Sequence, residues 1–193
     1  MFYSDMALVR IALVLLLAGG AAHAQEVAEL KARTGKPVIQ ELMGGCSLTC
    51  AFPWEAVAGG SSSDARVAAL NDADSHTAWT DAHAGDTLVF AFPSNLPREL
   101  NGTPFYGIDI ANGCLHPEIA FKAFGRIKTI RLYHNGHPLY MIHLADTRRW
   151  QHVAFSDVYL SIGDTLAIEV LDTYSGEEKR STAVTEIVLQ GAH

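Results

Sequence analysis

Short runs of β-forming residues, separated by turn residues, fill the chain from residue 87 onward. Each run is rich in β-branched and aromatic side chains, and the runs are 87–92, 106–111, 126–133, 139–144, 165–171 and 184–189. The intervals between the runs are too short for the helical crossovers that join parallel strands. The sequence therefore predicts an all-β fold, an antiparallel β-sandwich.

One turn in this series has a specific signature. Asn135 and Gly136 stand between the runs 126–133 and 139–144, and this pair favours a two-residue hairpin because both residues tolerate a positive φ. His134 and His137 flank the pair. We expect both histidines at an exposed hairpin tip, without a chemical role.

The first 24 residues have the pattern of a secretory signal peptide. The apolar run at 11–17 is too short to span a membrane, and it is followed by the cleavage pattern Ala22-His23-Ala24. Cleavage before Gln25 would leave 169 residues (193 minus 24), enough for one domain. A retained signal anchor is the alternative.

These features predict a secreted or periplasmic protein with no membrane span after cleavage. The expected organisation is a signal peptide at 1–24, a leader at 25–45 that ends in a first strand, and a β-sandwich domain at 46–193. The formal net charge is −7 and no dense Lys/Arg block occurs, which argues against nucleic acid and anionic membrane surfaces as partners.

Three cysteines bear on the fold. Export permits disulfides, and Cys46 and Cys50 lie close together in a loop-like segment, where a bridge would close a small loop. Cys114 is left over, and we expect it to be a buried small hydrophobic residue. Because no second close Cys or Cys/His pair completes four ligands, a zinc site is poorly supported.

An Asp-rich segment at 70–79 is the strongest candidate for a ligand. It carries Asp72, Asp74 and Thr77 among loop-forming residues and ends in Trp79. Carboxylate, hydroxyl and carbonyl oxygens converging in one loop suit calcium, with Trp79 anchoring the loop in the core. The alternative is that both aspartates are surface turn residues that bond to the nearby backbone.

Several motifs together resemble the NADase-type glycan-binding domain, a branch of the discoidin-like, galactose-binding-like β-sandwiches. The match extends from about residue 45 to residue 193, and its motifs are 45–50, 70–79, 112–114, 126–136, 144–148, 163–166, 172–176 and 182–187. Two features depart from the family pattern. Ala73 replaces the usual glycine of the Asp-rich loop, and the segment that follows Trp79 is shorter.

The resemblance implies a structural calcium ion. Its ligands would be Asp74, Thr77 and Glu186, with Asp72 nearby and backbone carbonyls completing the shell. An ion in this position would pin the loop to the last strand.

The resemblance also implies ligand recognition by loops at one end of the sandwich, where aromatic rings face sugars and planar polar groups bind hydroxyls. The candidate residues are Trp54, Tyr106, Arg148, Arg149 and Trp150. In the alternative reading, Trp150 belongs to the core and both arginines are solvated or paired with acids.

An enzymatic function is not expected. The sequence contains no His-Glu-x-x-His, no Gly-x-Ser-x-Gly and no phosphate-binding glycine loop. In proteins of the resembled family the glycohydrolase is a separate catalytic domain, for which this chain has no room. We therefore expect a secreted, non-catalytic module that binds carbohydrate, with a protein-binding or structural role in the envelope as the alternative.

Overall fold

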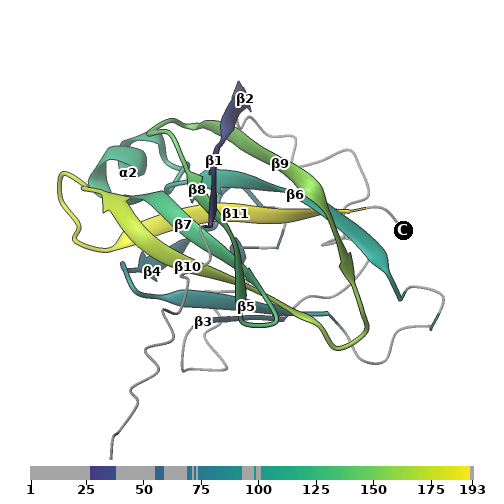
Figure 1. The fold of residues 1–193 in the computed structure, drawn as a ribbon. Coiled ribbons are helices and arrows are strands. Elements are labelled where there is room, and N and C mark those ends of the chain that lie inside the picture. Colours follow the sequence, from purple (N-terminus) through teal and green to yellow (C-terminus); the bar gives the residue numbers. More distant parts are fainter. Residues whose placement is uncertain are drawn as a thin grey trace, which may run out of the picture.

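The computed structural model describes residues 27–37, 55–58, 69–70, 72, 74–92, 98 and 101–191. In this part of the chain two mainly antiparallel sheets pack face to face (Figure 1). The predicted β-sandwich is therefore confirmed. The signal peptide at 1–24, the Cys46 and Cys50 pair and Trp54 lie outside the described residues.

The first sheet, here called sheet A, has six strands among the described residues. Their spatial order is β1 (Ala28–Lys31), β8 (His137–His143), β7 (Arg126–His134), β10 (Thr165–Tyr174), β5 (Thr87–Ala91) and β3 (Glu55–Ala58). All neighbours in this sheet are antiparallel except β1, which runs parallel to β8.

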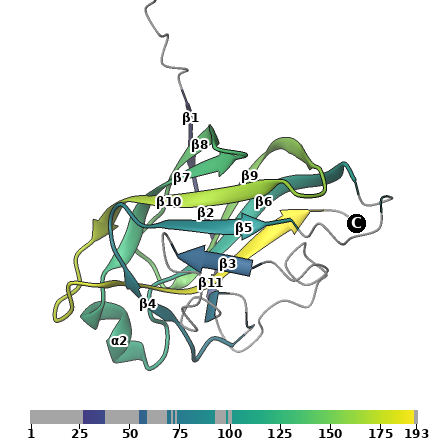
Figure 2. The same ribbon diagram turned by 90° about the horizontal axis from the view of Figure 1, so that it is seen from below.

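The second sheet, sheet B, has five strands within the same described ranges. Their order is β2 (Arg33–Pro37), β9 (Arg149–Leu160), β6 (Thr103–Asn112), β11 (Thr182–Gly191) and β4 (Trp79–Ala82), and all pairs are antiparallel. The short helix α2 (Glu118–Ala123) lies at one end of the sandwich, beside the connection from β10 to β11 (Figure 2).

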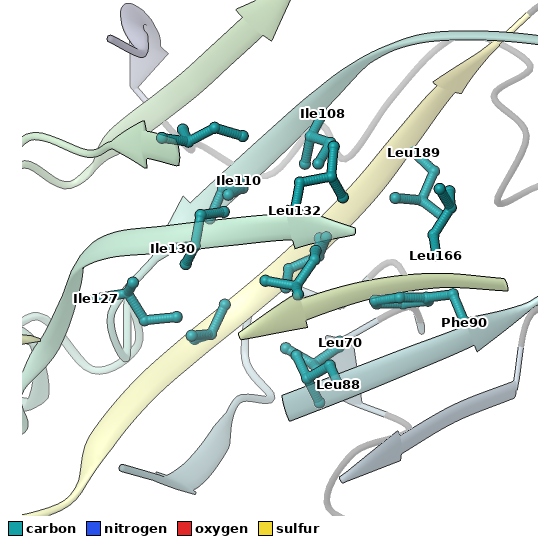
Figure 3. Packing of buried hydrophobic residues seen from close by; sticks show 14 of the residues in the cluster. Leu70, Leu88, Phe90, Ile108, Ile110, Ile127, Ile130, Leu132, Leu166 and Leu189 are labelled. Atoms are coloured by element: carbon teal, nitrogen blue, oxygen red, sulfur yellow. The ribbon is translucent and has the colours of Figure 1, made fainter. Parts of the chain in front are cut away.

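The core fills the space between the two sheets. Side chains from both inner faces interdigitate there, among them Leu88 and Phe90 from β5, Ile130 from β7 and Ile108 from β6 (Figure 3). Trp79 is 2% exposed and belongs to this cluster. The predicted anchoring of the Asp-rich loop by Trp79 is therefore confirmed.

The first described segment closes one side of the sandwich. β1 extends sheet A at β8 and β2 extends sheet B at β9, while Ala32 between them donates its backbone N–H to the His143 carbonyl at 3.0 Å. Leu30 and Ala32 pack against the core. A strand was expected in the 25–45 leader, and this segment supplies two short ones.

The hairpin between β7 and β8 has the predicted turn. Asn135 has φ 49° and Gly136 has φ 76°, as a turn with two positive φ angles requires. His137 is exposed as expected, but His134 is half-buried and lies 2.8 Å from Asp164 of the neighbouring turn. His134 therefore helps to join two turns.

Two further features complete the description. Cys114 is a free, buried cysteine as predicted, and its burial raises the pKa of the thiol. Within the described ranges, no helix has the length and apolar character needed to cross a membrane.

Candidate functional site

The outer face of sheet B carries an exposed aromatic pair. Tyr106 on β6 is 39% exposed and Tyr159 on β9 is 63% exposed, and they are the exposed large hydrophobic side chains of the described residues. Other large apolar groups of these two strands are buried, including Phe105 and Leu160. The two tyrosines are therefore the large aromatic side chains that these strands offer to a ligand.

The strand register places both rings on the same face. Pro104 pairs with Tyr159, and the neighbouring residues Phe105 and Leu160 point into the core. Because side chains alternate along a strand, Tyr106 next to Phe105 and Tyr159 next to Leu160 both point away from the core. The register is irregular between Phe105 and Gly107, so Tyr106 lies within the irregularity and has no register partner on β9.

A polar cluster lies further along the same face. Asp109 of β6 receives His152 Nδ1 of β9 on Oδ1 at 2.7 Å and Gln190 Nε2 of β11 on Oδ2 at 2.7 Å. The Asp109 side chain is only 14% exposed. Three adjacent strands thus hold one carboxylate in a fixed orientation.

The surface between the tyrosines and the polar cluster has little side-chain volume. Gly107 and Ala154 are register partners there. A Cβ on Gly107 would lie 2.7 Å from the Val153 carbonyl oxygen and 3.6 Å from Gln190 Cβ, so the strands leave no room for a larger residue. Gly107 is itself buried, and Ala154 is the exposed member of this pair, which is here called the floor.

At its other end the same face is covered. Trp150 is 8% exposed and packs with Ala111, Leu115 and Val188, and Phe121 of α2 lies against this cluster. The structure thus agrees with the alternative reading of Trp150 as a core residue. Its indole holds the segment before α2 on the sheet.

The two arginines beside Trp150 are engaged with the protein. Arg148 Nη2 donates to the Leu115 carbonyl at 2.9 Å, and its Nη1 lies 2.6 Å from Glu118 Oε1. Arg149 is exposed, and its Nε donates to the Gly35 carbonyl of β2 at 2.7 Å. These three neighbouring residues therefore hold the segment around α2 and strand β2 against sheet B. Tyr106 lies on the uncovered part of the same sheet.

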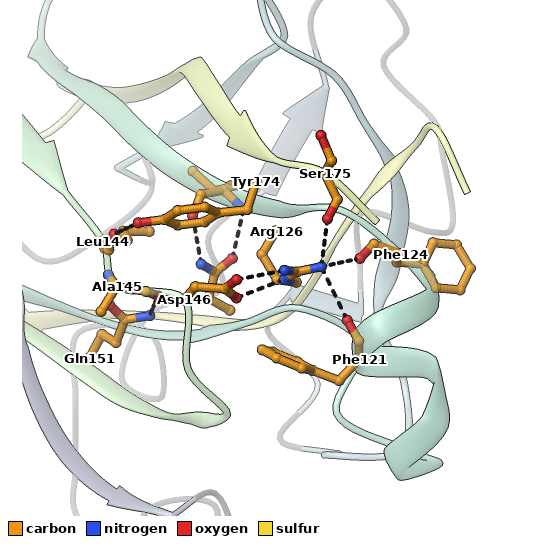
Figure 4. Close-up of polar contacts among 11 residues, drawn as sticks. Phe121, Phe124, Arg126, Leu144, Ala145, Asp146, Gln151, Tyr174 and Ser175 are labelled. Carbon is orange, nitrogen blue, oxygen red and sulfur yellow. Dashed lines mark hydrogen bonds and ion pairs between the residues drawn. The ribbon is translucent and has the colours of Figure 1, made fainter. Parts of the chain in front are cut away.

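Arg126 organises the end of the sandwich near α2. Its Nε and Nη2 bind Asp146 at 2.9 and 2.6 Å, and its Nη1 donates to the carbonyls of Phe124 at 2.8 Å and Ser175 at 3.1 Å (Figure 4). The Phe121 ring lies 5.1 Å from the guanidinium. One buried side chain thus joins three loops and fixes their shape.

Polar side chains next to Arg126 complete the same network. Gln151 exchanges two hydrogen bonds with the backbone of Ala145, and the Tyr174 hydroxyl donates to the Leu144 carbonyl at 3.0 Å (Figure 4). Asn112 makes a similar reciprocal pair with the backbone of Ile127. These contacts satisfy buried backbone groups and make this end rigid.

The Asp-rich loop is folded on itself. Asp72 accepts the Asp74 backbone N–H at 2.9 Å, and the Thr77 hydroxyl lies 2.7 Å from Asp72 Oδ2 and 3.0 Å from the Asp74 carbonyl oxygen. The backbone N–H and ring of His76 bond to Asp74 and lower the pKa of that carboxyl. Three oxygen atoms, from Asp72, Asp74 and Thr77, therefore meet in one small volume.

Glu186 lies on β11, far from this loop in sequence. It is 2% exposed. Val184 pairs with Trp79 in the antiparallel β11–β4 ladder, so continuing the register by two residues brings the Glu186 backbone level with Thr77. Among the described residues, no group of three or more His, Cys, Asp or Glu side chains is placed to hold a metal ion. A calcium shell here would need hydroxyl and carbonyl oxygens as well.

Four residues of the outer face were not predicted from the sequence: Tyr159, Asp109, His152 and Gln190. They come from three strands that are adjacent only in the folded sheet. The alternation of Tyr159 between Val158 and Leu160 was a usable signal for an outward tyrosine. The meeting of Asp109, His152 and Gln190 had no such signal, because it depends on the strand order.

Comparisons with known proteins agree with this architecture. The sequence model of the NAD glycohydrolase translocation F5/8 type C domain matches residues 56–190. β1 and β2 precede that match. No protein of curated function matches the sequence.

Solved structures share the fold at low sequence identity. The CBM32-1 and CBM32-2 domains of Clostridium perfringens ZmpB superpose with a TM-score of 0.54 and 11% identity, over 89% of this chain and 43% of theirs. The structure that also contains the M60 catalytic domain of ZmpB gives a TM-score of 0.53 and 10% identity, over 89% of this chain and 17% of that chain.

Proposed function

The chain belongs to the NAD glycohydrolase translocation F5/8 type C domain family, and we propose that it is a secreted, non-catalytic module that binds carbohydrate. The superposed CBM32 domains are carbohydrate-binding modules of the same discoidin-like fold. Secretion to the exterior or the periplasm rests on the signal-peptide pattern at 1–24.

The observation that carries the proposal is the exposure of Tyr106 and Tyr159 on one face of sheet B. A tyrosine ring offers an apolar surface for the C–H faces of a sugar and a hydroxyl for its polar edge. Two such rings on one face of the sheet would offer a sugar two stacking surfaces.

A non-catalytic role is supported by what the histidines contact. His134 pairs with Asp164 between two turns, His143 lies 3.5 Å from Glu29 of β1, and His152 pairs with Asp109 across β6 and β9. Each of these contacts joins neighbouring strands or turns. The histidines therefore stabilise the fold through these contacts.

A second candidate function is binding to another protein of the envelope. The family description names the translocation of an NAD glycohydrolase, which is favourable to a protein partner. An exposed tyrosine pair would also serve such an interface, because tyrosine is enriched in protein contacts. The two functions differ in whether a free oligosaccharide is sufficient as a ligand.

We also propose that calcium binds at the Asp-rich loop, through the carboxylates of Asp72 and Glu186, the Thr77 hydroxyl and loop carbonyls that include that of Asp74, whose carboxylate bonds to His76. Support comes from three oxygen atoms, since the Thr77 hydroxyl lies 2.7 Å from Asp72 Oδ2 and 3.0 Å from the Asp74 carbonyl oxygen. The β11–β4 register, continued by two residues, also places the Glu186 backbone opposite Thr77. Hard oxygen donors of this kind match the preference of calcium. The ion would supply stability to the loop.

A glycan-array screen of the purified chain, followed by titration of any hit, tests the main proposal. We expect saturable binding that weakens by at least about fivefold in Tyr106→Ala, because stacking on an aromatic ring contributes about 1 kcal/mol. Tyr133→Ala, on the other sheet, is the matched control and should bind normally. Absence of any glycan hit, with binding to an envelope protein instead, would favour the second candidate.

A further inference from the structure

We infer that the ligand is a neutral oligosaccharide that lies along the outer face of sheet B. It would run from Tyr106 and Tyr159, across Gly107 and Ala154, to the polar cluster around Asp109. This inference rests on the proposed carbohydrate function and adds to it a binding surface and a class of ligand. The surface is a sheet face, distinct from the loops around Trp150.

The aromatic end of this surface provides apolar contact. Tyr106 and Tyr159 come from paired strands, and Phe105 and Leu160 beneath them are fully buried. The backbone under both rings is therefore fixed by the core. Rings held in this way lose little freedom on stacking against a sugar.

The floor between the two ends lets a ligand approach the backbone. Ala154 is exposed and contributes only a methyl group, and its register partner Gly107 is buried beside it. A flat pyranose ring can lie on such a surface, whereas a larger side chain at either position would lift it away.

The polar end offers hydrogen-bonding groups that are already oriented. A carboxylate has about four acceptor positions, of which His152 and Gln190 each use one on Asp109. The Gln190 amide still presents its oxygen, since only its nitrogen donates to Asp109. Such preorganised groups bind vicinal hydroxyls at a low entropic cost.

The spacing of the two ends sets the size of the ligand. Tyr106 and Asp109 are three residues apart on β6, which corresponds to about 10 Å of strand. One hexose ring cannot reach both groups. The ligand that contacts both ends is therefore at least a disaccharide.

The charges around the face select a neutral ligand. Asp109 and the exposed Asp157 contribute negative charge, and Arg33, the register partner of His152, contributes positive charge. The local charges are mixed in sign, and the whole chain carries a formal net charge of −7. A strongly anionic glycan would be repelled at long range by this net charge.

The experiment is isothermal titration of the full chain with neutral hexose oligosaccharides, from monosaccharide to hexasaccharide, and with oligouronides as the anionic counterpart. Ala154→Arg places a bulky side chain on the floor without removing a contact of the fold. Ala91→Arg makes the same change at an exposed alanine of sheet A and is the control. Gln190→Ala tests the polar end.

We expect a neutral oligosaccharide of two or more units to bind, and Ala154→Arg to weaken binding at least about tenfold while Ala91→Arg leaves it unchanged. Gln190→Ala should weaken it about three- to tenfold, the effect of one hydrogen bond. Equal binding by Ala154→Arg and wild type, or preference for oligouronides, overturns this inference and leaves the carbohydrate function standing. No binding of any saccharide to wild type overturns the function itself.

Discussion

Arg126 shows how much of one end of the molecule depends on a single residue. Its guanidinium is largely buried, satisfies three backbone carbonyls and forms a two-pronged ion pair with Asp146. Asp146 is more exposed, so part of the charge interaction is screened by solvent. The three carbonyls are partly buried, and each accepts a hydrogen bond from this one guanidinium.

Arg126→Met should therefore lower the free energy of unfolding by roughly 3 kcal/mol, because it leaves buried carbonyls and Asp146 without their donor. Chemical denaturation of wild type and variant measures this difference. Lys128→Met breaks an exposed ion pair with Asp172 and serves as the control, for which we expect little change. Equal effects of the two substitutions would contradict the structural role of Arg126.

Asp164 links protonation to stability. Its burial raises the pKa of the carboxyl, but hydrogen bonds from the Ser161 backbone, Asn135 and His134 outweigh this and hold the pKa below its ordinary value. A carboxyl with a lowered folded-state pKa stabilises the fold above its unfolded pKa, and this contribution is lost as the pH falls through the folded value.

We therefore expect wild type to lose stability on acidification below about pH 4 more steeply than Asp164→Asn. Urea unfolding at a series of pH values between neutral and pH 3 measures the slope. Asp157→Asn, at an exposed position of β9, is the matched control and should keep the wild-type slope. Parallel curves for wild type and Asp164→Asn would show that this turn is not linked to protonation.

Calcium binding gives a prediction at the Asp-rich loop. If Asp72 and Glu186 supply ligands, calcium should raise the melting temperature of wild type relative to chelator, because an ion that binds only the folded chain stabilises it. Thermal unfolding in calcium and in chelator measures the shift. Asp72→Asn and Glu186→Gln should each reduce this shift in melting temperature. An identical melting temperature of wild type in both conditions would show that calcium does not bind.

At the scale of elements, the segment containing β1 and β2 depends on close contact with β9. A Cβ on Gly35 would overlap the His152 ring, and that ring is held by Asp109. Leu30 and Ala32 supply the apolar contacts of the segment. The fit of β2 against sheet B therefore requires glycine at position 35.

Gly35→Ala should displace β2 and increase amide hydrogen exchange in residues 33–37, at a cost of about 1 kcal/mol from the steric conflict. His152→Ala removes the ring, so adding Gly35→Ala to that variant should cost little. Hydrogen exchange measured by mass spectrometry on the two single variants and the double variant closes this cycle. Additive effects would show that Gly35 and His152 do not interact.

The elements also show what the sequence could predict. All six expected β runs lie in strands, and the Asn135–Gly136 turn is present, because these features depend on local propensity and turn chemistry. No run was expected over the full length of β9, although its first residues were read as strand-like, and α2 was not expected. β9 contains the exposed residues Ser156 and Asp157 near a register irregularity, and α2 is too short to give a helical periodicity.

The candidate site was less predictable than the fold. Tyr106 was expected as a ligand contact and is exposed, but Trp150 is buried and Arg148 is bound to Leu115 and Glu118. Alternation along one strand does not tell which side faces the partner sheet. The order of β9, β6 and β11, which assembles Asp109 with His152 and Gln190, follows from long-range pairing.

In the whole molecule, one end of sheet B is covered by other segments and the other end is exposed. The end near α2 is covered and cross-linked by Arg126, Arg148 and Trp150. The opposite half of the face leaves Tyr106 and Tyr159 exposed above a rigid core. A stable scaffold with one open aromatic face is the arrangement that a binding module requires.

We propose carbohydrate binding on the open half of sheet B, where Tyr106 and Tyr159 are exposed. Chemical-shift mapping of the isotopically labelled chain, titrated with the strongest saccharide from the array, tests it most directly. We expect shifts concentrated on β6 and β9 around Tyr106, Gly107 and Ala154, and on Gln190 of β11. Shifts concentrated in the loops at 113–118 and 144–148, with these residues unchanged, would contradict it.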